Sequence, residues 1–329
     1  MAQTQVILLR SCSEELAQQI DASGPIVFPG IPNAPVNLSR APNTAPETGR
    51  VLLSRFTVDV VTRLLALSCT YEDNKERNAV HHQLNLVAIA LQLVKPTSPF
   101  LRLWMQLDGG NMVVMAERGI SDLGVDLGPE PYLQYQQHNS LTQPDVKRAL
   151  ALLPRITQAL EKQHDSWNHP LLPIHRALIL FCQGYSAVPP DSRQFFWSAG
   201  LDCLYASKIE RKKQGSPEIC RRMQQFLGAK MKLYEANNVT IPCHQKTRTH
   251  KELDSVSADI FKLRNAFAHG LTIPDSWLYA DGQPPESGYA YQLLEQTEIA
   301  LRLSLIKILE DQVLFETFSN ATRLDAFFS

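Results

Sequence analysis

The sequence of 329 residues has no apolar run that approaches the roughly 18 residues of a membrane-spanning helix. It also has no excess of either charge, because 32 Lys and Arg residues stand against 33 Asp and Glu residues. A net charge near zero gives no global argument for binding nucleic acid or membrane, so any electrostatic signal has to be local. The first residues lack the basic segment and small-residue cleavage site of a secretory signal, and we expect a cytoplasmic protein.

Several common site patterns are also missing. The six cysteines are scattered and lie mostly in apolar helical runs, which indicates buried free thiols rather than a disulfide framework. Residues 119–131 contain glycines but not the strand, glycine loop and helix with Lys that form a phosphate-binding loop. Cys243, His244 and His250 invite a zinc interpretation, but no second Cys pair stands at a suitable spacing. We therefore expect no metal and no cofactor.

The first half of the chain has a mixed pattern. Residues 25–48 hold six prolines and predict an extended or loop segment, whereas 50–68 and 77–94 show the apolar periodicity of helices. Two short apolar runs, 100–107 and 112–118, flank Gly109 and Gly110, and this combination predicts a β-hairpin.

From about residue 144 onward almost every segment has a helical pattern. Apolar spacing, capping residues and prolines predict helices over 143–163 (broken or ended near Pro154), 171–185, 190–207, 216–231, 251–270 and 289–318. The expected fold is mainly α, with a helical domain over 141–329 that follows a mixed α/β region over 1–140 containing the small hairpin.

One stretch, "KLRNAFAHGL" from Lys262 to Leu271, carries the candidate chemistry. Apolar residues at steps of four, three and four predict one buried stripe along this helix. Asn265 and His269 are four residues apart and therefore lie on one face, and the long side chain of Arg264 can reach the same area. This spacing allows a guanidinium, an amide and an imidazole to converge.

These three groups suit the cleavage of a phosphodiester. Arg264 can hold two phosphate oxygens and offset the charge that develops on them. His269 can give or take a proton near neutral pH, because imidazole changes its charge there. Asn265 can orient either group. The pattern by itself does not separate a phosphate-handling site from an ordinary helix end, because an Arg followed by a His at this spacing also arises by chance.

The segment "RNAFAH" matches the R-x4-6-H signature of HEPN domains, and its surroundings resemble the Apea-like branch of that family. "RQFFWSAGLDCLYAS", "ICRRMQQFLG", "IFKLRNAFAHG" and "LEQTEIALRLSLIKILED" follow one another as the helices of such a domain do, over about residues 170–318. Asp202 stands in the first of these helices where the resemblance leads us to expect Glu. The resemblance implies a bundle of four or five helices.

The resemblance also implies an activity, which is metal-independent RNA cleavage by attack of the 2′-hydroxyl, leaving a 2′,3′-cyclic phosphate and a 5′-hydroxyl. Arg264 would bind phosphate, His269 would transfer protons and Asn265 would position them, in a site shared across a homodimer. A toxin, defence or RNA-processing role follows from the same resemblance, with an antitoxin or regulatory protein as a further partner.

Two other interpretations stay open. Arg264 can simply pair with an acidic residue such as Asp202 while His269 caps the helix carbonyls, in which case there is no site. Many HEPN domains are also non-catalytic, so the chain can be a module that binds RNA or a nucleotide, or a dimeric scaffold.

Local positive charge is concentrated before the motif. Residues 208–232 hold eight Lys or Arg residues against two Glu, and 244–251 add more. This region can be a surface for the RNA backbone or merely a solvated helix face. The candidate RNA-binding residues are Lys208, Arg211, Lys212, Lys213, Arg221 and Arg222.

Overall fold

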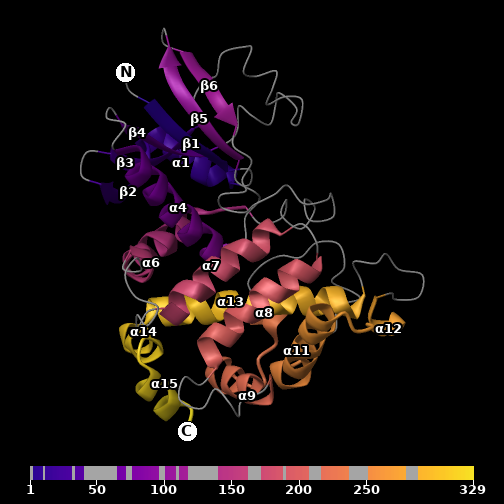
Figure 1. The fold of residues 1–329 in the computed structure, drawn as a ribbon. Helices are drawn as coiled ribbons and strands as arrows, with labels where there is room; N and C mark the ends of the chain where they lie inside the picture. Colours follow the sequence, from indigo (N-terminus) through magenta and orange to yellow (C-terminus); the bar gives the residue numbers. More distant parts are fainter. Residues whose placement is uncertain are drawn as a thin grey trace. The chain divides into compact units, whose positions relative to one another are not determined.

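Figure 1 shows the protein as a computed structural model, in which two compact units divide at residues 153 and 154. The structure describes residues 3–9, 12–31, 34–40, 65–71, 76–95, 101–108, 111–117, 140–161, 172–187, 190–206, 216–236, 251–278 and 288–329. The division lies inside a helix, beyond the boundary near residue 140 that the sequence suggested.

The first unit contains a six-stranded antiparallel sheet with the order β2-β3-β4-β1-β5-β6. Its strands are β1 Gln3–Leu9, β2 Ile26–Ile31, β3 Ala34–Arg40, β4 Leu65–Tyr71, β5 Leu101–Asp108 and β6 Asn111–Glu117. The predicted hairpin is confirmed, since β5 and β6 pair with each other. The proline-rich segment is extended where it is described, as β2 and β3.

Two helices accompany this sheet, α1 Glu14–Ser23 and α4 Arg77–Val94. The second has the predicted bounds and packs against β1, β2, β3 and β4. Its Gln83 donates from Nε2 to the carbonyl oxygen of Pro29 at 3.0 Å, and the Gln5 amide donates to the carbonyl of Arg77 at 3.2 Å. These bonds satisfy polar groups at an otherwise apolar helix–sheet contact.

The predicted helix over 50–68 is wrong at its C-terminal end. Leu65–Ser68 belong to β4, which pairs with β1 on one side and with β3 on the other. A central strand that is buried on both faces appears in sequence as a continuous apolar run, and periodicity alone cannot separate such a run from a buried helix. The remainder of that prediction, 50–64, lies outside the described residues.

The second unit is helical. Its elements are the end of α6 (Gln143–Glu161), α7 Leu172–Ser186, α8 Pro190–Tyr205, α9 Ser216–Leu227, α10 Leu233–Ala236, α11 Leu253–His269, α12 Asp275–Leu278, α13 Tyr289–Glu310, α14 Gln312–Phe318 and α15 Ala321–Phe327. Helix α6 continues through Pro154, where a break was predicted. Its buried stripe continues on both sides of the proline, from Val146 to Leu160, so packing holds the helix together despite the missing N–H.

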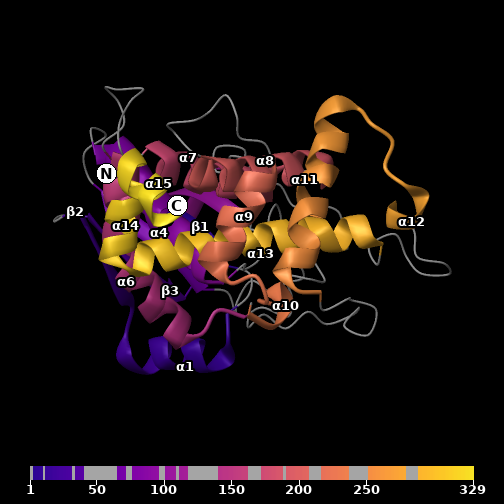
Figure 2. The same ribbon diagram turned by 90° about the horizontal axis from the view of Figure 1, so that it is seen from below.

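The centre of the second unit is α13, which contacts α7, α8, α9, α10, α11, α12 and α14 (Figures 1 and 2). The single long helix predicted over 289–318 is in fact two helices. Asp311 is extended between them, with φ −114° and ψ 120°, and its carboxylate accepts hydrogen bonds from the backbone N–H groups of Val313 and Leu314. An N-cap inside an unbroken apolar pattern therefore starts a new helix.

Buried polar groups cross the bundle at α13. Arg302 and Glu298 are 1% and 4% exposed, and their side chains pair at 2.7 Å. Tyr185 of α7 donates its hydroxyl to the same carboxylate at 2.6 Å. Removing one partner of such a group leaves a buried charge uncompensated, so this cluster fixes the alignment of α7 with α13.

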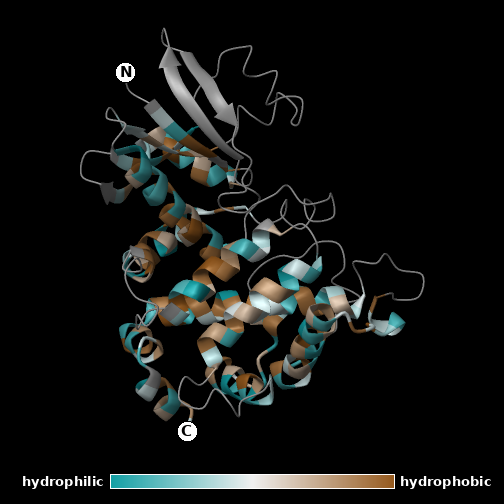
Figure 3. Cartoon of the chain, in the orientation of Figure 1, coloured by the Kyte–Doolittle hydropathy of each residue, from teal (hydrophilic) through white to brown (hydrophobic). Residues whose placement is uncertain are grey.

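The outer helices α9 and α11 show hydrophilic and hydrophobic bands side by side, as expected of helices with one buried face (Figure 3). Among the helices that the structure describes, none is long and apolar enough to cross a membrane.

Helices α7 and α8 approach each other closely at Gly184, where an added Cβ would overlap the indole ring of Trp197. That ring is 1% exposed and its N–H donates to the carbonyl of Phe181 at 3.1 Å, so it cannot move aside easily. Gly184→Ala should gain about 1 kcal/mol in helix propensity. We expect overpacking to outweigh this gain and to destabilise the protein by about 1–3 kcal/mol.

Urea unfolding followed by circular dichroism measures the effect. Gln183→Ala, at an exposed position of the same helix, is the matched control and should change little. A Gly184→Ala protein more stable than wild type would contradict the close approach.

Candidate functional site

Helix α11 buries Val256, Ile260 and Leu263 of the predicted apolar stripe, whereas Phe267, its last member, is half-buried, and the helix ends at the predicted glycine. Gly270 has φ 62° and ψ 32°, in the left-handed region, and its N–H bonds to the last turn of the helix. The N–H of Leu271 reaches back to the carbonyl of Ala266 at 2.8 Å. Backbone groups thus close the helix, as in the usual glycine C-cap.

Arg264 lies between α11 and α8. Its guanidinium pairs with the carboxylate of Asp202 and donates to Oδ1 of Asn265 at 3.0 Å. Its Cζ atom lies 5.7 Å from the centre of the Phe261 ring. The side chain is 23% exposed, so it is held on several sides without being sealed from solvent.

The carboxyl group of Asp202 is partly buried at the contact between α8 and α11. Burial raises the pKa of its carboxyl, and the nearby charge of Arg264 offsets part of that rise. Its Oδ1 atom is buried and has no hydrogen-bond partner among the residues that the structure describes. The carboxylate therefore depends on Arg264, and the pairing that we expected under the structural interpretation is present.

His269 is exposed in the last turn of α11. Its imidazole makes no hydrogen bond or ion pair within the part of the chain that the structure describes. It does not cap the helix, because the backbone at Gly270 and Leu271 does so. The structure thus joins Arg264 to Asn265 and leaves the imidazole on the same helix open to solvent.

The other candidate RNA-binding residues divide into two groups. Lys208, Arg211, Lys212 and Lys213 lie outside the described residues. Arg221 and Arg222 of α9 both bond to Glu218, and Arg222, only 5% exposed, also pairs with Asp325 of α15 at 2.8 Å.

Arg221 additionally donates to the carbonyl oxygen of Phe328 at 2.8 Å. This geometry gives both arginines a part in attaching the C-terminal helix to α9, which sequence reasoning did not anticipate.

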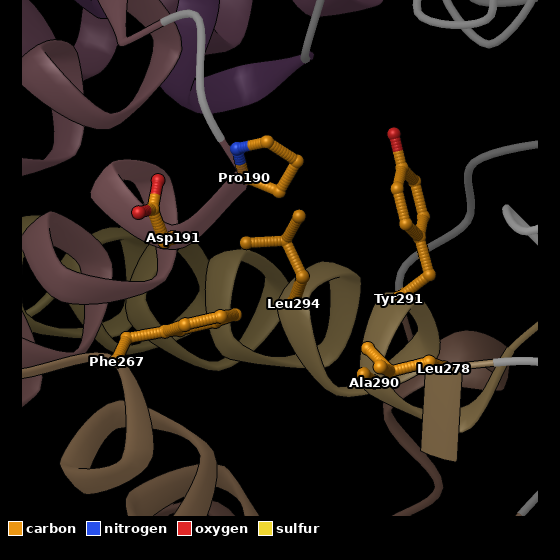
Figure 4. A pocket seen from close by; sticks show the side chains of 7 residues that line it. All are labelled: Pro190, Asp191, Phe267, Leu278, Ala290, Tyr291 and Leu294. Carbon is orange, nitrogen blue, oxygen red and sulfur yellow. The ribbon is translucent and has the colours of Figure 1, made fainter. Parts of the chain in front are cut away.

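A pocket of about 450 Å³ lies beside the end of α11, where Phe267 forms part of its lining (Figure 4). Among the described residues its lining is mostly apolar, and it consists of Pro190, Asp191, Phe267, Leu278, Ala290, Tyr291 and Leu294. None of the three polar motif residues lines it. The pocket is therefore not where Arg264 and His269 would act.

Within the described residues, no group of three or more His, Cys, Asp or Glu side chains could hold a metal ion. Cys243, His244 and His250 are outside those residues. Comparison with protein-family models found no match, and searches of curated proteins and of solved structures found no similar protein.

The cluster around Glu218 predicts a response to acid. Hydrogen bonds from Arg221, and then from Arg222, lower the pKa of Glu218 from 4.5 to about 2. The stabilisation is therefore complete above about pH 4.5 and is lost as the pH falls toward 2, because the unfolded chain takes up this proton first.

We expect Glu218→Gln to be less stable than wild type at pH 7, with a difference that shrinks below pH 4.5. Thermal melts from pH 7 to pH 3 measure this difference. Glu316→Gln is the control, since it removes an exposed carboxylate 3.4 Å from Arg323 and should change stability little. A difference that is constant with pH would contradict the assignment.

Proposed function

We propose that the chain is a metal-independent endoribonuclease of HEPN type, in which Arg264, Asn265 and His269 form the catalytic group. The observation that carries the proposal is the exposed imidazole of His269, unbonded within the described residues, on the same helix as the bonded pair of Arg264 and Asn265. The motif and the order of its helices support the family assignment. A toxin, defence or RNA-processing role belongs to the same proposal.

The reaction needs one proton removed and one supplied. The 2′-hydroxyl gives its proton to a base as its oxygen bonds to phosphorus, and the bond from phosphorus to the 5′-oxygen breaks as that oxygen takes a proton. The products are a 2′,3′-cyclic phosphate and a 5′-hydroxyl. His269 has the chemistry for either proton transfer, and Arg264 for neutralising the phosphate oxygens.

This chemistry favours two copies of the chain. In-line displacement places the attacking and leaving oxygens on opposite sides of the phosphorus, so one imidazole cannot reach both. A second copy supplies a second His269 and a second Arg264. The part of α11 that carries His269 is exposed and leaves room for such an arrangement.

The pairing of Arg264 with Asp202 favours a second candidate function. If the guanidinium serves only to compensate a buried carboxylate, the domain binds RNA or a nucleotide without cleaving it, or acts as a dimeric scaffold. The two candidates predict different effects of substituting Arg264 and His269 on the rate of RNA cleavage.

We expect His269→Ala to lower the rate of RNA cleavage by about 10²–10⁴-fold, because proton transfer is lost. Arg264→Lys should lower the rate about 10²–10³-fold, because Lys keeps the positive charge but lacks the planar guanidinium that can bind two phosphate oxygens at once. Cleavage of labelled RNA with and without EDTA measures both. His82→Ala and Arg323→Ala remove exposed side chains elsewhere and are the matched controls. Cleavage that survives both motif substitutions sinks the enzyme assignment.

Replacing both members of the Arg264–Asp202 pair separates structure from catalysis. Arg264→Leu alone leaves the Asp202 carboxylate unpaired and should destabilise the protein, whereas Arg264→Leu with Asp202→Leu should recover most of the stability. We expect the double variant to melt near the wild-type temperature and still not cleave RNA. A stable double variant with full cleavage would assign Arg264 a structural role alone.

A further inference from the structure

The outer face of α11 extends from His269 toward the start of the helix. Lys262, Asn265, Ala266 and His269 follow at steps of three, one and three residues, so they share one side. Lys262 and His269 are exposed, and the Lys262 side chain is 68% accessible. Two turns of helix therefore present a cation and an imidazole in one line.

Two aromatic rings lie beside this face. Tyr289, at the start of α13, donates its hydroxyl to Oδ2 of Asp259 at 2.9 Å, and Lys262 donates to the other oxygen of that carboxylate at 2.9 Å. Trp277 of α12 meets the Tyr289 ring edge-on, with centres 5.3 Å apart. Lys251 holds its ammonium 4.3 Å from the centre of the same ring.

The short helix α12 is fixed in this position by a close backbone approach. An added Cβ at Gly288 would overlap the carbonyl oxygens of Leu278 and Trp277. Only glycine lets α12 pack so closely on the start of α13. Trp277 is therefore presented on a fixed element, and its side chain remains partly exposed.

We propose that an aromatic–lysine strip binds single-stranded RNA and leads it to His269. The strip consists of Lys251, Lys262, Trp277 and Tyr289. Unpaired bases stack on aromatic rings, and lysines beside those rings neutralise the phosphates between the bases. The carboxylate of Asp259 does not oppose RNA binding, because its two oxygens already accept hydrogen bonds from Lys262 and Tyr289. A paired duplex hides its base faces and has no such contact to make.

This inference rests on the proposed function for its direction, since it places the strip next to the imidazole that would act on the RNA. It concerns binding, however, and binding can be measured without cleavage. A 2′-O-methyl RNA lacks the attacking hydroxyl, so it can occupy the strip but cannot be cut by the proposed reaction.

The test measures fluorescence anisotropy of a labelled, unpaired 2′-O-methyl RNA of about 12 nucleotides, a length within the range of stacking grooves. We expect Trp277→Ala to weaken binding about 5- to 100-fold, since stacking on one ring is lost. Trp277→Phe keeps a ring and should bind within about threefold of wild type. An RNA duplex of the same sequence should compete poorly.

The lysines give a second, independent measurement. Lys262→Ala should reduce the slope of log affinity against log salt by about 0.7, the value for one phosphate contact on a single strand. Lys147→Ala removes an exposed lysine of α6 and is the matched control, with no change in slope expected. Thermal melts of every variant exclude unfolding as the cause, and the lysine variants keep the test valid if Trp277→Ala does not fold.

The outcomes separate the two proposals. Binding that depends on Trp277 and Lys262, with no cleavage of ordinary RNA, keeps the strip and sinks the nuclease. Cleavage that depends on His269, combined with RNA binding that is unchanged by substitution of Trp277 and Lys262, supports the nuclease and overturns the strip. Loss of dimer in Trp277→Ala without loss of RNA binding shows that the strip contacts a second copy instead, and overturns the inference. Absence of any RNA binding by wild type overturns it too.

Discussion

Burial of α13 on almost every side is the constraint around which the helical unit is organised. Seven of the described helices contact it, and even its charged residues Glu298 and Arg302 are buried. The two buried charges have to be compensated inside the protein, and they are, through their own pairing and through the hydroxyl of Tyr185. Because few other packing arrangements would compensate these buried charges, the neighbouring helices are held in defined positions and orientations on α13.

Helix α11 gains a defined orientation from this packing. One side of α11 contacts α8, α9 and α13, so the position of each polar residue around the helix decides whether it faces the bundle or the solvent. Arg264 lies at the edge of the contact and reaches Asp202, Asn265 is half-buried beside it, and His269 is exposed. Arg264 compensates the carboxylate of Asp202, and in the proposed nuclease it would also bind the phosphate. The same geometry is therefore compatible with a catalytic role and with a purely structural role for Arg264.

Much of this arrangement was predictable from sequence. Helices α7, α8, α9, α11 and α13, the glycine end of α11 and the hairpin follow from local pattern, since each has its own spacing or capping signal. The short helices α10, α12 and α15 were not predicted. The strand β4 did not, because the apolar residues at its start continue the pattern of the preceding segment and have no period that separates a strand from a buried helix. The break at Asp311 was not predicted, because the short polar segment Glu310–Gln312 is also compatible with the exposed face of one continuous helix. The ring pair of Trp277 and Tyr289, and the attachment of Arg222 to Asp325, join residues distant in sequence, so only the folded chain brings them together.

The glycine that ends α11 also constrains the length of the segment before it. Each residue added to a helix turns the following side chains by about 100°, so one insertion between Asn265 and Gly270 would carry the imidazole off the outer face. Substitutions within "AFA" that keep its length would leave His269 in line with Lys262, whereas a deletion of one residue would misdirect it even with every polar side chain retained. The spacing of this segment is therefore as much a part of the site as its chemical groups.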